Sequence, residues 1–382
     1  MEQKKKRKWL RLLWIPAGIL IIALIYVAYV FIAYYRVEDN LSLEVVNARP
    51  VTPTDVAATD TPYTLISYNV GFGAYSADFS FFMDGGKESR ARSAEEARDN
   101  IGGAMQTVAA QSPDFIFIQE LDTDGTRSHH IDQRYIVLYE LPAGEWQYAF
   151  AQNYDSPYLF YPFLHPHGAN KSGIMTLSSK AVTSSLRRSL PVENSVMKLV
   201  DLDRCYSVTR VPVAGSEKEL ILYNLHLSAY TSDGTIAVEQ LQMLVADMTE
   251  EYEKGNYCVA GGDFNKDLPG NSAELFGVPA PKDSNWAQPI PEGVISPELT
   301  LIVPLHEDAP VASCRTASES YDPATTFRIT VDGSTYWKTR SVDFDGLVRQ
   351  ELAALAPGVT FDIFRIDEAP MVGAAVAAVG NL

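Results

Sequence analysis

Hydrophobic and polar positions divide the chain into one long apolar run near the N-terminus and many short apolar segments after it. The long run covers residues 12–35, which are 24 residues without a charge. As a helix it would extend about 36 Å, enough to cross a bilayer with some tilt. Trp14, Tyr34 and Tyr35 lie near its ends, where membrane-spanning helices commonly carry aromatic side chains. The pattern therefore predicts a transmembrane helix at 12–35.

The charges that flank this run predict its orientation. Residues 1–11 contain four lysines, two arginines and Glu2, a net charge of +5. Basic flanks stay on the cytoplasmic side, so we expect a cytoplasmic tail at 1–11 and an extracellular domain after the helix. A cleaved signal peptide is the alternative, but its apolar region normally has about 7 to 15 residues. The sequence favours an uncleaved anchor in the cell membrane.

From Tyr63 onward the apolar segments are short, and many alternate with polar residues, as in β-strands. Two segments, near 93–110 and 235–252, instead show the apolar spacing of helices. We interpret residues 36–62, rich in Pro, Thr, Asp and Ala, as a linker. Strands without a regular βαβ alternation predict packed sheets covered by helices, in one domain at 63–382. The expected strands are 63–70, 115–120, 146–151, 173–179, 206–213, 219–227, 257–263, 342–348 and 374–379.

Charge and cysteine content narrow the function of this domain. The whole chain has a net charge of −17, so the residues after the basic tail carry −22. Such a domain lacks the basic surface with which many proteins attract nucleic acid. A polyanionic substrate would need a bound metal ion to offset the repulsion. The three cysteines, Cys205, Cys258 and Cys314, are too few for a disulfide framework and match no zinc pattern.

Polar residues follow the apolar part of four predicted strands. Asp263 and Asn265 are two residues apart, so on an extended strand they would face the same side. Gly261 and Gly262 before them leave room for a close approach to the backbone. Each polar residue has a structural explanation on its own, such as a turn, a cap or a satisfied histidine. Together they suggest one site for a hard cation or a metal-held phosphate. They are Asn69, Glu120, His226, Asp263 and Asn265.

Four motifs that contain these residues, "SYNVGFG", "FIFIQELD", "NLHLSA" and "GGDFN", occur in an order and spacing that resemble the endonuclease/exonuclease/phosphatase superfamily. The similarity covers about residues 63 to 380. It implies an α/β fold, a four-layer sandwich of two packed mixed β-sheets flanked by helices, here after one transmembrane helix. It also implies metal-assisted hydrolysis of a phosphodiester or phosphomonoester, with Mg²⁺ (or Mn²⁺) as the cofactor.

The resemblance implies a role for each matched residue. Asn69 and Glu120 would hold the metal ion. Asp263 would orient or deprotonate the attacking water, and Asn265 would bind a phosphoryl oxygen. His226 would donate a hydrogen bond to the pentacoordinate transition state.

Two further residues are candidates in the same site. "VDFDGLV" matches a family strand, which makes Asp345 a residue expected to orient a catalytic histidine or a metal-bound water. Arg127, shortly after Glu120, is a candidate for binding the substrate phosphate, with a surface loop as the alternative. His165 and His167 are interpreted as part of a solvent loop, because two histidines without a third ligand give little support for a metal site.

The chain departs from the family near its end. The family usually ends in Ser-Asp-His-x-Pro, whereas this chain reads "FDIFRIDEAPMVGAAV" and its last histidine is His306. Aligning on Pro370 places Glu368 where the family has histidine. Either Glu368 serves as a base with a raised pKa, or another residue reaches in from elsewhere, or the chain is an inactive relative that binds ligands.

The sequence thus predicts a membrane-anchored, outward-facing, metal-dependent phosphoesterase. Its acidity and tethering favour a lipid or a small phosphodiester over a long nucleic acid. The alternatives are an extracellular nuclease with the same site and a non-catalytic binding protein. No protein partner is inferred.

Overall fold

The computed structural model describes residues 2–301 except 77–78, 80, 85, 195, 200, 230–234, 269 and 272–287, together with five short strands after residue 301. The first half contains α1 (Glu2–Ala33), β1 (Leu41–Leu43), β2 (Val46–Asn47), β3 (Leu65–Asn69), η1 (Gly71–Gly73), η2 (Phe82–Asp84), α2 (Ala94–Ala109), β4 (Phe115–Gly125), α3 (Arg134–Glu140), β5 (Gln147–Asp155), β6 (Asn170–Ser178) and β7 (Ser184–Ser189). The second half contains η3 (Val196–Leu199), β8 (Cys205–Pro212), β9 (Glu219–His226), α4 (Thr235–Glu253), β10 (Tyr257–Asp263), β11 (Lys266–Asp267), β12 (Gln288–Pro289), β13 (Leu305–His306), β14 (Ala309–Pro310), β15 (Thr326–Val331), β16 (Ser334–Thr339) and β17 (Asp362–Phe364).

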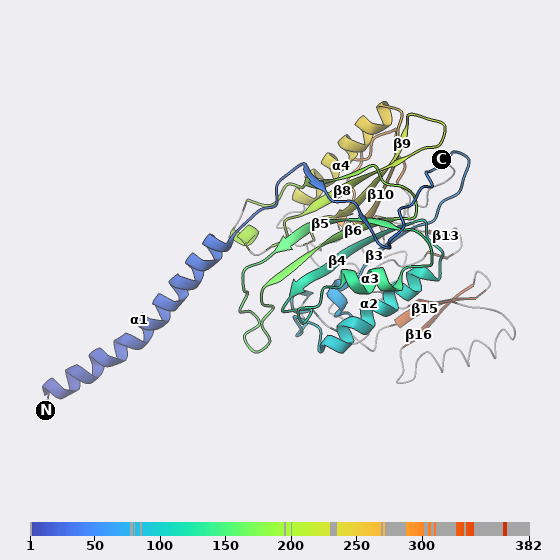
Figure 1. The fold of residues 1–382 in the computed structure, drawn as a ribbon. Helices are drawn as coiled ribbons and strands as arrows, with labels where there is room; N and C mark the ends of the chain where they lie inside the picture. The colour runs from blue at the N-terminus through green and yellow to red at the C-terminus, as the bar shows by residue number, and fades with distance from the viewer. Residues whose placement is uncertain are drawn as a thin grey trace.

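Two five-stranded sheets pack face to face (Figure 1). One has the strand order β1-β7-β8-β9-β10 and the other β2-β5-β6-β4-β3. Both sheets are mixed, because β9–β10 and β3–β4 are parallel pairs while the remaining neighbours are antiparallel. Phe115 and Phe117 of β4 pack between the sheets against Leu220 and Leu222 of β9. The two parallel pairs therefore lie in facing sheets.

Helices cover the outer face of each sheet. On α2, Ile101, Met105 and Val108 recur at spacings of four and three residues and pack against the sheet that contains β4. The Ser93 hydroxyl caps this helix by accepting a hydrogen bond from the Glu96 backbone N–H. On the other side, α4 packs against the sheet that contains β9. The order helix, sheet, sheet, helix confirms the four-layer α/β sandwich expected from the sequence.

Polar side chains join the two sheets toward the end that carries the site. Gln119 on β4 donates a hydrogen bond to Asn224 Oδ1 on β9, with a distance of 2.7 Å. The hydroxyls of Thr176 on β6 and Ser207 on β8 are 2.9 Å apart. Since buried polar groups need partners with defined geometry, these contacts fix one sheet relative to the other. Glu120 follows Gln119 directly, so this contact lies beside the site.

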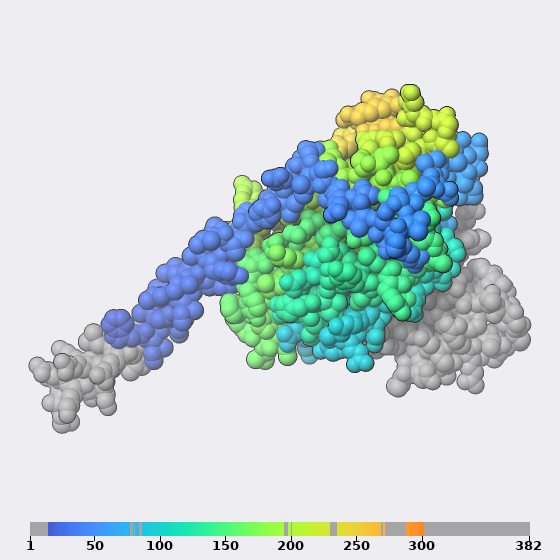
Figure 2. Space-filling view, in the orientation of Figure 1, coloured from blue at the N-terminus to red at the C-terminus, as the bar shows by residue number. Residues whose placement is uncertain are grey.

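The helix α1 extends away from the sandwich (Figure 2). Its segment Trp14–Ala33 has a mean hydropathy of 2.6, and 6% of the apolar window is buried within the chain. The helix is long and apolar enough to cross a membrane, as the sequence predicted. A signal sequence near an N-terminus has the same properties, so the span and its orientation stay predictions.

The structure differs from the sequence interpretation at residues 36–62. β1 pairs with β7 in one sheet, and β2 pairs with β5 in the other. Ala57 is fully buried and forms a bridge with Val213. The segment interpreted as a linker thus belongs to the domain. Strands of two or three residues are too short for alternation to reveal them, and the segment's Pro and Thr content resembles that of a spacer.

Candidate active site

The carboxyl ends of β3, β9 and β10, together with the middle of β4, bring an acid–histidine cluster together. β4 continues to Gly125, beyond the strand end expected at Glu120. One ligand atom each from Glu120, His226 and Asp263 lie within 4.8 Å of one another. His226 Nε2 is 3.6 Å from Asp263 Oδ2 and 3.9 Å from Glu120 Oε1. The sequence predicted that these three distant residues lie close together, and the structure places them close together.

Strand register explains how these side chains meet. In the parallel pair β9–β10, His226 lies opposite Asp263. In the parallel pair β3–β4, Asn69 lies opposite Gln119, one residue before Glu120. Both parallel pairings stop at these positions, so each pair presents its polar residues there, although β4 itself continues to Gly125.

A β-bulge directs Glu120 into the site. The register between β4 and β6 shifts between Ile118 and Leu121, and Glu120 has a φ of 54°. A left-handed backbone in a residue other than glycine costs roughly 1–3 kcal/mol and is held by the surrounding structure. Bulges of this kind often re-aim a side chain beside an active site. The backbone is thus arranged around the position of this carboxylate.

Asn69 ties the two carboxylates together. Its Nδ2 donates hydrogen bonds to Asp263 Oδ2 at 2.7 Å and to Glu120 Oε1 at 3.1 Å. Its Oδ1 accepts a hydrogen bond from the Gly71 backbone N–H at 2.9 Å. Asn69 therefore positions both acids in this arrangement, and its expected role as a metal ligand stays a prediction.

Asn265 reaches the site through a turn. β10 ends at Asp263, and the Asn265 N–H donates to Asp263 Oδ1 at 2.9 Å. The alternation of side chains along a strand is therefore not what aligns these residues, although both line the cavity. The turn, the structural explanation of this spacing, is present. The expected role of Asn265 in binding a phosphoryl oxygen stays a prediction.

The glycine before Asp263 does allow a close approach, but by the neighbouring strand. Gly262 has a φ of 145°, and a Cβ there would lie 2.1 Å from the Leu225 carbonyl oxygen. Any side chain would therefore push β9 away from β10. Gly262 keeps His226 and Asp263 side by side.

Burial sets the protonation of the cluster. Burial, followed by the charges of Arg204 and Arg127, holds the pKa of His226 well below its usual value. Burial raises the pKa of Asp263 to about 7, and the nearby charge of Glu120 also raises it while the Asn69 hydrogen bond lowers it. Two ionised carboxylates this close repel each other. The nearby charge of Arg204 lowers the pKa of Asp263, but by less than burial raises it.

These donors fit a divalent cation. Glu120 and Asp263 offer carboxylate oxygens, which hard cations prefer. His226 Nδ1 is buried without a hydrogen-bond partner among the residues that the structure describes. An unpaired nitrogen and two crowded acids are what a nearby cation with its water shell would satisfy.

The cluster forms the floor of a cavity of about 410 Å³. Arg127 lines this cavity and is only 4% exposed, so the surface-loop alternative for it is wrong. Its Nε and Nη2 donate to the Asp122 carboxylate at 3.0 and 2.7 Å, and its guanidinium lies 4.1 Å from the Phe72 ring centroid. Because Asp122 already pairs with it, substrate binding by Arg127 stays a prediction.

Arg204 is a cavity residue that sequence reasoning missed. It is 4% exposed, and its Nε and Nη1 have no hydrogen-bond partner within the described part of the chain. A buried guanidinium with unfilled donors is unusual, because such groups are normally paired. In the sequence it is a single arginine before an apolar strand, and no local signal distinguishes it from a surface charge.

His167 also differs from the sequence interpretation. It is buried and lines the cavity, with Nδ1 2.9 Å from the Ser89 carbonyl oxygen. Burial, and then the charge of Arg127, lowers the pKa of His167 to about 3. The solvent-loop interpretation is therefore wrong for His167.

Two candidates cannot be placed. Asp345 and Glu368 lie outside the described residues, as do the expected strands at 342–348 and 374–379. Their roles, and the consequence of the departure at the chain's end, stay predictions.

The four-layer sandwich and its strand-end cluster define the class of fold that the sequence motifs resemble. A sequence model of the Endonuclease/Exonuclease/phosphatase family matches residues 66–289, which is more than half of the chain. The chain belongs to this family. Membership supports hydrolysis of phosphoester bonds as the broad class of activity.

Comparison with solved structures finds similar folds at low sequence identity. The human Nocturnin catalytic domain with bound sulfate is 16% identical over 59% of this chain and 68% of that chain, with a TM-score of 0.35. TDP2 from Caenorhabditis elegans is 15% identical over 55% of this chain and 49% of that one, with a TM-score of 0.34. ANGEL2, a 2',3'-cyclic phosphatase, is 12% identical over 86% of this chain and 91% of that chain, with a TM-score of 0.40. No curated protein matches the chain. These likenesses carry no information about its substrate.

Proposed function

We propose that this protein is a metal-dependent phosphoesterase that hydrolyses a phosphodiester beside the membrane that α1 enters. The observation that carries the proposal is the convergence of Glu120, His226 and Asp263 within 4.8 Å on the floor of one cavity. Few protein ligands, supplemented by water and substrate oxygens, suit Mg²⁺ or Mn²⁺.

Glu120 would hold the metal ion, with Asn69 and Asp263 beside it. A bound ion would supply Lewis-acid chemistry to the phosphoryl group and to the water. Asp263 would orient the attacking water, because Asn69 and the Asn265 N–H fix both of its oxygens in direction. His226, held neutral by burial, would donate a hydrogen bond from one ring nitrogen to the phosphoryl group.

Arg204 would supply a second positive charge for the phosphate. Its unpaired donors line the same cavity as the acids. Charge-assisted hydrogen bonds between a guanidinium and a phosphate are strong and directional. With a metal ion, this residue would supply positive charge next to the phosphate, in a domain whose net charge is −22.

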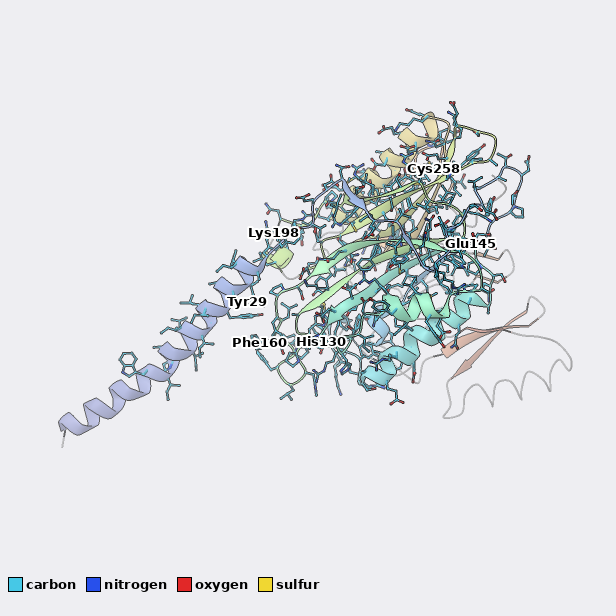
Figure 3. All side chains as sticks on the ribbon, viewed as in Figure 1. Tyr29, His130, Glu145, Phe160, Lys198 and Cys258 are labelled. Carbon is cyan, nitrogen blue, oxygen red and sulfur yellow. The ribbon has the colours of Figure 1, made fainter. Side chains whose placement is uncertain are left out.

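Removal of the Glu120 carboxylate tests the proposal. Full-length protein in detergent should hydrolyse bis-p-nitrophenyl phosphate with Mg²⁺ or Mn²⁺, lose activity with EDTA and regain it when the ion is restored. Glu120→Gln should lower the rate by about 10³-fold, because it removes a charge from the metal site. Glu145→Gln, the same change at an exposed position (Figure 3), should have no effect.

Activity equal in Glu120→Gln and the wild type would contradict the proposal. Metal binding by calorimetry without any turnover would instead support the non-catalytic alternative.

A further inference from the structure

The loop between β5 and β6 contacts the apolar helix α1. We call residues 156–166, "SPYLFYPFLHP", the aromatic loop; it contains no Asp, Glu, Lys or Arg. Tyr26 on α1 donates a hydrogen bond from its hydroxyl to the Tyr158 carbonyl at 3.1 Å, and the Tyr158 N–H donates to the Tyr29 hydroxyl at 2.9 Å. The rings of Tyr26 and Phe160 are 5.2 Å apart. Figure 3 shows Tyr29 and Phe160 on these two neighbouring segments.

The position of these contacts along α1 gives the depth of the loop. Tyr26 and Tyr29 come seven and four residues before Ala33, the last residue of the helix. At 1.5 Å per residue, the loop meets the helix about 6 to 10 Å before its end. Where α1 crosses a membrane, this is the depth at which interfacial segments bury their apolar faces.

The outer part of the aromatic loop is apolar and exposed. Phe163 is 82% exposed and Leu164 is 89% exposed, and Phe160 and Tyr161 are also exposed. Soluble surfaces rarely gather large apolar side chains in this way, and such patches mark contact with a membrane or a partner. Here the patch lies beside an apolar helix, so a bilayer that contains the helix would also cover the patch.

The same segments line the catalytic cavity. Tyr26 and residues 159–161 of the aromatic loop form its wall on this side. Lys198, near the end of α1 in Figure 3, and Arg204 add positive charges to the lining. The cavity thus combines an apolar wall continuous with the helix and a polar floor that holds the acids. A nucleic acid would instead need a basic groove along its backbone.

We propose that the cavity opens to the bilayer between α1 and the aromatic loop, and that its substrate is a membrane phospholipid. This inference rests on the proposed function. The headgroup phosphate reaches the floor while the acyl chains follow the apolar wall back into the membrane. Hydrolysis adds one water oxygen to phosphorus, breaks one P–O ester bond and transfers a proton to the leaving oxygen, so that a phosphomonoester and an alcohol form without another reactant.

Paired assays on two substrates test this inference. Full-length Phe163→Ser/Leu164→Ser should hydrolyse phospholipid in mixed phosphatidylcholine and sphingomyelin vesicles about 10-fold more slowly than the wild type. Its hydrolysis of soluble bis-p-nitrophenyl phosphate should stay within about 2-fold, because the floor is unchanged. Tyr139→Ser, which removes an exposed aromatic side chain on α3, should leave both rates unchanged.

Three results of these assays would overturn the inference: equal losses on both substrates, no loss on vesicles, or hydrolysis of plasmid DNA without hydrolysis of phospholipid. A readout that does not need catalysis separates it from the proposed function. Each of two variants adds one tryptophan to the protein, and brominated lipids quench the fluorescence of a tryptophan that contacts them. In vesicles with these lipids, the fluorescence added by Phe163→Trp should be quenched. The fluorescence added by Tyr139→Trp should not be quenched. Quenching without turnover would reject the proposed function alone, whereas turnover of soluble substrate without quenching would reject the membrane-facing cavity alone.

Discussion

The floor and the mouth of the cavity are built in different ways. At the floor, His226 and Asp263 are buried and come from strand ends fixed by parallel pairing, and the buried Asn265 follows in a turn. At the mouth, Phe163 and Leu164 are exposed on a loop. Two hydrogen bonds connect this loop to α1. The difference indicates that the strands determine the chemistry of the site, while the helix and the loop determine what reaches it.

The rigidity of the floor has a direct structural cause. Asn69 joins both carboxylates, and Gln119 bonds to Asn224 across the sheets one residue before Glu120. Moving any one of these groups would leave a buried donor or acceptor unpaired, at a cost of about 1–3 kcal/mol. The exposed loop bears no comparable cost, and can therefore change between proteins without loss of the fold.

Among the substitutions that test this comparison, a change at Arg204 should have the largest effect. Arg204→Met keeps most of the volume but removes the donors that would bind phosphate, so kcat/KM should fall about 100-fold, equivalent to about 2.7 kcal/mol. Arg204→Lys keeps the positive charge, and its kcat/KM should fall by about 10-fold. Because Arg204 is buried in the lining of the cavity that holds the acids, we place it with the floor. Its substitution should therefore lower the rates on soluble and vesicle substrates equally in steady-state assays.

If kcat/KM falls only for vesicle substrates, Arg204 acts at the mouth of the cavity. The separation of roles between the floor and the mouth would then be wrong. Thermal unfolding of both variants serves as the control for folding.

Much of the fold could be predicted because its elements carry clear periodicity. The expected strand at 257–263 coincides with β10, and the expected helix near 93–110 contains α2. Glu120 is a candidate from the sequence because it is one of several polar residues that each follow a mostly apolar run. These signals are local, and the packing of the sandwich agrees with them.

The missed features depend on contacts between distant segments. His167 is buried because Phe81, Phe82 and Tyr154 pack around its ring. Arg204 is buried because the cavity forms around it, which no neighbour in its sequence indicates. Pairing of β1 and β2 likewise depends on β7 and β5, which are far along the chain. Such positions are set by tertiary structure, which can override local sequence patterns.

A smaller effect, on the stability of the folded protein, is expected when the pH is lowered. It comes from His167, which lines the cavity. Its pKa is about 3 in the folded protein and about 6.5 when unfolded. Below pH 6.5 the unfolded chain binds a proton that the folded one does not, so stability is lost as the pH falls from 6.5 toward 3. At pH 5 the loss should be about 2 kcal/mol. Urea unfolding of the full-length protein in detergent at pH 7 and pH 5, compared between the wild type and a variant without this histidine, measures it.

The matched variants are His167→Asn, which should change the pH dependence by this amount, and His130→Asn at an exposed histidine, which should leave it as in the wild type. His226 and Asp263 titrate in all three proteins, so their contribution cancels in the comparison. If His167→Asn keeps the full pH dependence of the unfolding free energy, then water reaches His167 in the folded protein. The part of the cavity lining that contains His167 would then belong with the mouth.

The smallest effect should come from the contact between α1 and the aromatic loop. Tyr26→Phe removes the hydrogen bond to the Tyr158 carbonyl but keeps the ring against Phe160. One such bond contributes about 1 kcal/mol, so vesicle hydrolysis should fall by at most about 5-fold, with no change for a soluble substrate. Tyr35→Phe, at an exposed tyrosine just after the helix, is the control. Equal losses on both substrates would mean that the contact also shapes the floor, and the two regions would then act as a single unit.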